Sequence, residues 1–96
     1  EGLATYFEVR YDETHGGRSA RAWLRGAYDG RSAASPFWAL RISDPGPTHI
    51  FDNAVYVRGA MTMAASRLAC DEWVASGGTG DLPALVARYL AAIRIE

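Results

Sequence analysis

Few side chains in this sequence could carry out chemistry, and their spacing does not join them into a complete site. The two histidines, His15 and His49, are too far apart to form the HExxH pair that binds zinc from one helix. Cys70 is the single cysteine, which excludes an internal disulfide and a zinc site built on cysteines. Glu1 offers a carboxylate and Tyr56 a phenol. By residue type alone, however, a lone glutamate is usually solvated and a helical tyrosine usually belongs to the core.

The composition is that of one globular domain, residues 1–96. Hydrophobic residues make up 49% of the 96 positions, which is enough for a packed core. The ten basic residues are all arginines spread along the chain, and the net charge is −1, which argues against a nucleic-acid-binding surface. No apolar run approaches the roughly 20 residues that a membrane-spanning helix needs. We therefore expect neither a nucleic-acid partner nor a membrane span, while the compartment stays open.

Three segments carry the apolar period of an α-helix, namely residues 19–29, 53–74 and 82–94. Each begins next to a residue that can cap a helix N-terminus: Ser19, Asp52 or Asn53, and Asp81. Gly59 lies inside the second segment, where it costs about 1 kcal/mol relative to alanine. A glycine at that position predicts that something packs very close to the helix backbone.

The first segment fits two secondary structures about equally well. Residues 4–11 alternate with the period of a β-strand and are rich in strand-favouring types. The same stretch also places Leu3, Phe7 and Tyr11 at the spacing of one helix face, as part of a helix over residues 2–14.

The segment over residues 31–51 is expected to be an irregular connection. It contains Pro36, Pro45 and Pro47, which interrupt both helices and strands. Connections of this length are uncommon and often functional. The apolar side chains of Phe37, Trp38 and Leu40 are expected to hold it to the core.

Two short motifs, taken in order, resemble one enzyme family. Glu1-Gly2-Leu3-Ala4 is similar to the end of the Asn-Glu-Gly-(Phe/Leu)-Ala motif of aminopeptidase N-like zinc metallopeptidases, the gluzincins. Tyr56-Val57-Arg58-Gly59-Ala60 matches that family's Tyr-x-(Lys/Arg)-Gly-Ala motif in full. The resemblance covers roughly residues 1 to 74 and departs from the family after Trp73. In the family, an upstream helix carries HExxH, whose histidines bind zinc and whose glutamate is the general base.

The resemblance implies a role for each of the two residues. Glu1 would be the third zinc ligand, and Tyr56 would donate a hydrogen bond to the oxyanion that develops during hydrolysis of a peptide substrate. It also implies that the first segment is helical. The expected fold is therefore all-α, with about four helices and a long proline-containing connection. The runner-up is an α+β fold in which residues 4–11 form a strand.

The sequence contains no HExxH, so the resemblance implies part of an enzyme. We expect the chain to be the C-terminal half of a catalytic domain whose parent binds zinc. A single carboxylate is a poor zinc site, so we expect no zinc and no peptide hydrolysis in the isolated chain. The alternative is a non-catalytic helical binding module that keeps only the fold.

The resemblance also implies an uncovered surface. In the family, the helix with the third ligand packs against the HExxH helix, and the tyrosine helix faces the same cleft. Without the HExxH helix, the side chains of Leu3, Tyr6, Phe7 and Tyr56 would lack partners. Contiguous apolar patches rarely stay uncovered on a monomer. We therefore expect the isolated chain either to self-associate through this surface or to adjust so that the surface is buried, with low stability in either case.

Overall fold

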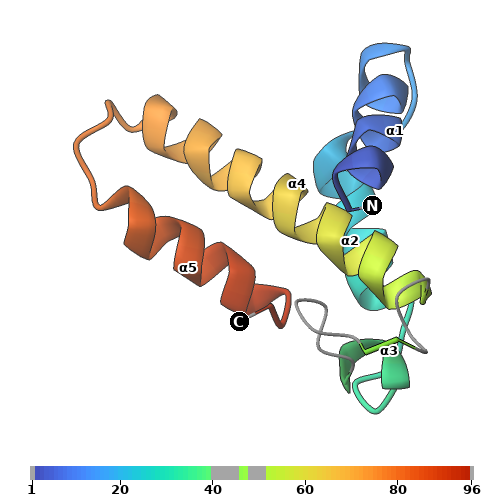
Figure 1. Ribbon diagram of the computed structural model, residues 1–96. Helices are drawn as coiled ribbons and strands as arrows, with labels where there is room; N and C mark the ends of the chain where they lie inside the picture. The colour runs from blue at the N-terminus through green and yellow to red at the C-terminus, as the bar shows by residue number, and fades with distance from the viewer. Residues whose placement is uncertain (1, 40–45, 48–51, 96) are drawn as a thin grey trace.

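The computed structural model describes residues 2–39, 46–47 and 52–95, and all regular structure in these residues is helical (Figure 1). The helices are α1 (Gly2–Thr14), α2 (Ala20–Asp29), α3 (Pro36–Ala39), α4 (Asn53–Ala75) and α5 (Leu82–Ala92). The all-α prediction is confirmed, and residues 4–11 belong to a helix. No helix in the described part of the chain is long and apolar enough to cross a membrane.

Helix α4 is the centre of the fold and contacts each of the other four helices. Helix α1 crosses it, and α5 runs back antiparallel beside its C-terminal half (Figure 1). A helix with neighbours on several sides needs small residues, because large side chains would hold the neighbours away. Alanines supply them: Ala54, Ala60, Ala64, Ala65 and Ala69 are all fully buried in α4.

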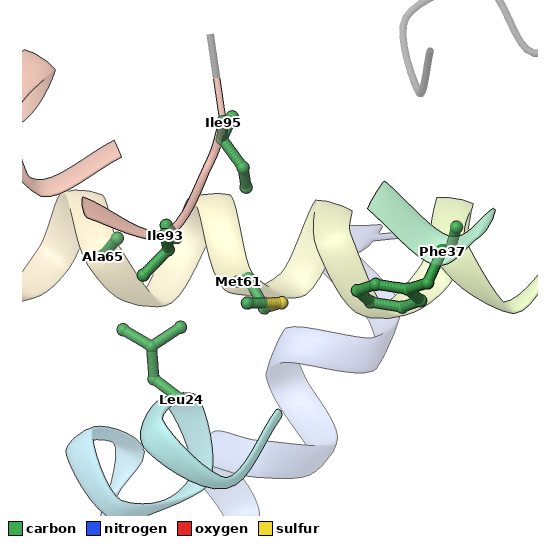
Figure 2. Close-up of a cluster of buried hydrophobic side chains, with 7 residues drawn as sticks. Leu24, Phe37, Met61, Ala65, Ile93 and Ile95 are labelled. Carbon is green, nitrogen blue, oxygen red and sulfur yellow. The ribbon is translucent and has the colours of Figure 1, made fainter. Parts of the chain in front are cut away.

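The main core lies on one side of α4 (Figure 2). Met61 is its largest fully buried side chain, and Leu24 of α2 and Phe37 of α3 belong to the same cluster. Ile93 and Ile95, which follow α5, complete the cluster. Side chains from α2, α3, α4 and the segment after α5 therefore meet in one cluster.

A second, smaller cluster lies where α1 meets α4. Tyr6 is only 8% exposed and packs against Ala60 and Ala64, with Trp23 of α2 beside it. This cluster fixes the side of α1 that faces α4.

The predicted helix starts are confirmed by their caps. The side chains of Ser19, Asp52 and Asp81 each accept a hydrogen bond from a backbone N–H two or three residues further on. The end of α5 differs from the prediction, because the helix stops at Ala92 instead of continuing to residue 94. Arg94 adopts a positive φ of 63°, and the Ile95 N–H donates to the Leu90 carbonyl in a Schellman-type ending. This ending turns Ile95 into the core.

The expectation that residues 31–51 are irregular is wrong at α3, which forms a short helix. Pro36 occupies its first position, where a missing N–H costs little, and the Ser35 hydroxyl accepts a hydrogen bond from the Phe37 N–H. Phe37 is buried, so its expected contact with the core is confirmed. Leu40 and Pro45 lie outside the described residues.

Candidate functional site

The backbones of α1 and α4 touch at a pair of glycines. A Cβ atom built on Gly2 would lie 2.7 Å from the Gly59 Cα, and one built on Gly59 would lie 2.8 Å from the Gly2 Cα. Such distances leave no room for a side chain at either position. The prediction that something packs closely against Gly59 is confirmed, and the neighbour is the first turn of α1.

This crossing brings the two motifs together. Gly2 belongs to the first motif and Gly59 to the second. Tyr56 is one helical turn before Gly59, so it lies on the same side of α4 as the crossing. Glu1 precedes Gly2 in the sequence but lies outside the described residues.

Tyr56 is partly buried in α4. Its phenol makes no hydrogen bond with any residue that the structure describes, so the hydroxyl is free to donate to another molecule. The start of α1 and the Tyr56 turn of α4 together form the candidate site.

A charged junction holds α1 in this position. The Glu13 carboxylate accepts hydrogen bonds from the Ala20 N–H at 2.8 Å and from Arg67 Nη1 at 2.7 Å. It thus ties the end of α1 to the start of α2 and to α4. These hydrogen bonds, first the one from Ala20 and then the one from Arg67, lower the pKa of Glu13 from 4.5 to about 2.

Sequence reasoning did not single out Glu13. Its partner Arg67 is 54 residues away in the sequence, so no local pattern connects the two. The one available signal was a carboxylate near a helix end, which is too common to identify a junction.

Arg58 matches the basic position of the second motif but points away from the crossing. It is only 6% exposed, its Nη2 donates to the Arg94 carbonyl at 3.4 Å, and its guanidinium lies 6.0 Å from the centre of the Trp38 ring. Burial lowers its pKa. These contacts give Arg58 a structural role at the end of the chain.

No group of three His, Cys, Asp or Glu side chains converges in the described ranges. His15 is exposed, stacks on Tyr11 and lies with Nδ1 2.8 Å from the Tyr11 carbonyl. His49 lies outside those ranges, and Cys70 is exposed. The described residues therefore do not form a zinc site by themselves.

The uncovered surface differs from the one expected. Tyr6 was predicted to lack a partner, and this is wrong because it packs on the alanines of α4. Helix α1 has two apolar stripes, and the one containing Gly2 and Tyr6 fits the flat alanine surface. The other stripe, the outer stripe, consists of Leu3, Phe7 and Tyr11, which are 51%, 59% and 62% exposed.

Comparisons of the chain with protein-family models, with curated proteins and with solved structures find no match. The function of the chain is therefore inferred from its residues and their geometry.

Proposed function

We propose that this chain is the C-terminal part of the catalytic domain of an aminopeptidase N-like zinc metallopeptidase. Glu1 would be the third zinc ligand and Tyr56 the hydrogen-bond donor to the transition state. The observation that carries the proposal is the contact between Gly2 and Gly59. The two motifs that resemble the family are far apart in the sequence, yet their glycines touch.

The chemistry divides between this chain and a preceding segment. Zinc supplies a Lewis acid and an activated water when it is held by three protein ligands. This chain would contribute one carboxylate to that set, and the HExxH helix would contribute two histidines and the general base. The isolated chain is then inactive.

The resemblance assigns Tyr56 its role, and the absence of a hydrogen bond between its hydroxyl and any described residue supports that assignment. A phenol is a neutral donor, so it stabilises an oxyanion more than it stabilises the uncharged carbonyl of the substrate. A tyrosine whose hydroxyl already bonded within the fold would have to give up that bond first. Tyr56 has no such bond with the described residues.

The outer stripe of α1 supports the same proposal. Leu3 and Phe7 are exposed on the stripe of α1 that lies beside the one packed on α4. A helix carrying HExxH would cover them, and burying one such side chain contributes about 1.5–3 kcal/mol. The proposal therefore gives these exposed side chains a partner.

Complementation tests the proposal. The chain is co-expressed with the preceding half of an aminopeptidase N-like catalytic domain, which carries HExxH. Zinc content and hydrolysis of aminoacyl 4-nitroanilides are then measured on the purified complex. We expect Glu1→Gln to lose zinc. We expect Tyr56→Phe to keep zinc and to lose about 10²–10³-fold in kcat, as for other oxyanion donors.

Tyr11→Phe is the matched control, since Tyr11 is an exposed tyrosine on α1, and it should behave like the unaltered chain. Full activity in Tyr56→Phe, or unchanged zinc in Glu1→Gln, would contradict the proposal.

The alternative function is a helical binding module without catalysis, and the outer stripe is the observation that favours it. A module would use Leu3, Phe7 and Tyr11 to bind an apolar partner. In that case, complementation would give a complex that forms through the outer stripe but neither gains zinc through Glu1 nor hydrolyses the substrate.

A further inference from the structure

A groove of about 590 Å³ lies between α2, α4 and α5. Its apolar lining comes from all three helices: Leu24, Leu68, Leu85, Tyr89 and Ile93. The groove involves the C-terminal half of α4. Leu68 is twelve residues beyond Tyr56, which is about 18 Å along the helix axis, so the groove is separate from the candidate site.

Arginines dominate the edges of this groove. Arg21 and Arg25 are one turn apart on α2, and Arg88 belongs to α5. All three are exposed, and none makes an ion pair or hydrogen bond with a described residue. Asp29 and Glu72 also line the groove, so its charge is positive by one.

The geometry points to an acidic amphipathic helix of a partner protein as the occupant. Apolar side chains on one face of such a helix would fill the space above Leu68 and Leu85. Carboxylates on its flanks would meet Arg21 and Arg25 on one side and Arg88 on the other. This arrangement is the helix-in-groove mode, with the charges setting the orientation.

The exposure of the edges favours a protein segment over a small enclosed ligand. Pockets for small molecules cover most of the ligand surface. Here Arg21, Arg25 and Arg88 are all exposed, so the groove is open to solvent along both sides. A helix can lie in such a groove with its polar face in water.

The test uses a synthetic, fluorescein-labelled helical peptide of about 15 residues, a length at which isolated helices begin to be stable. It carries leucines at helical spacing, flanked by glutamates. A second peptide has lysine at every glutamate position. Fluorescence anisotropy is measured as the full chain is titrated into each peptide. We expect saturable binding of the acidic peptide, weakened by added salt, and no saturable binding of the lysine peptide.

Variants then locate the site. Arg25→Glu should weaken binding about three- to tenfold, because it removes one attractive charge and adds a repulsive one. Arg18→Glu is the control, since it makes the same change in net charge as Arg25→Glu. Arg18 is exposed but does not line the groove. It should leave the Kd within about twofold, and circular dichroism checks that both variants fold.

Four results would overturn the inference: absence of saturable binding, equal binding of the lysine peptide, equal weakening by Arg18→Glu, and displacement of the acidic peptide by oleate at lower concentration than by unlabelled peptide. The last would identify a small amphipathic anion as the occupant. None of these outcomes depends on zinc or on peptidase activity, so the proposed function is tested separately.

Discussion

The two sides of α4 hold their neighbours in different ways. On the side of α1, contact is made by small residues, Gly59, Ala60 and Ala64, and the helices approach until their backbones touch. On the other side, Met61 meets large side chains such as Leu24 and Phe37. The first side fixes where two backbones lie, and the second removes more apolar surface from water. We infer that the first side positions the candidate site and the second supplies most of the stability.

The largest expected effect on the free energy of unfolding concerns the side of α4 that carries Met61. Met61→Ala should lower the free energy of unfolding by about 2–5 kcal/mol, because it leaves a cavity where four parts of the chain meet. Urea denaturation followed by circular dichroism measures the loss. Met63→Ala is the matched control: Met63 is 39% exposed on the same helix, and its replacement should cost well under half as much. Similar losses in the two variants would show that Met61 is not a core residue.

The next effect tests the glycine contact. Gly59→Ala should destabilise the fold by about 1–2 kcal/mol, since the overpacking cost exceeds the helix-propensity gain of about 1 kcal/mol. The neighbouring atoms belong to the Gly2 backbone, which cannot move aside as a flexible side chain would.

Gly26→Ala provides the comparison. A Cβ there would meet only the end of the Arg18 side chain, so this exchange should stabilise α2. Stabilisation by Gly59→Ala as well would mean that α1 and α4 do not touch in solution.

A third, smaller effect concerns pH. Hydrogen bonds lower the pKa of Glu13 from 4.5 to about 2, so the unfolded chain binds more protons between these values. Glu13 therefore contributes stability above pH 4.5 that is lost as the pH falls toward 2.

In Glu13→Gln, the dependence of unfolding free energy on pH in this range should be shallower than in the unaltered chain. Glu8→Gln, an exposed position on the same helix, should not change it. A Glu13→Gln profile parallel to that of the unaltered chain would contradict the junction.

Local features of the fold were predictable from the sequence, and contacts between distant segments mostly were not. The caps at Ser19 and Asp81 and the helical periods depend on neighbouring residues, and the structure has them as expected. Gly59 lowers the stability of an isolated helix, so its presence predicted a closely packed neighbour. No local pattern in the sequence identified that neighbour as Gly2.

The incorrect predictions also concern contacts between segments that are distant in the sequence. Helix α1 carries two apolar stripes, and only the flat alanine surface of α4 decides that Tyr6 is buried and Phe7 is exposed. The left-handed conformation of Arg94 likewise depends on the core that Ile95 enters. The candidate site was predicted from the types and order of residues in two motifs, because the helical period alone does not connect Gly2 with Gly59.

The smallest expected effect on stability concerns the outer stripe. Phe7 is 59% exposed, so Phe7→Ser removes little buried surface and should change the free energy of unfolding by less than about 0.5 kcal/mol.

The same substitution should have a clearer effect on self-association of the chain. Leu3, Phe7 and Tyr11 form one continuous apolar face, which a second copy of the chain can cover at high concentration. Sedimentation velocity over a concentration series should show self-association of the unaltered chain, reduced in Phe7→Ser. Val74→Ser is the control, because Val74 is an apolar residue at the far end of α4 that is 68% exposed, slightly more than Phe7. A chain that stays monomeric at high concentration, with or without Phe7→Ser, would show that the outer stripe needs no partner. That result would remove one support for the proposed HExxH partner helix, whereas the contact between Gly2 and Gly59 would stand unchanged.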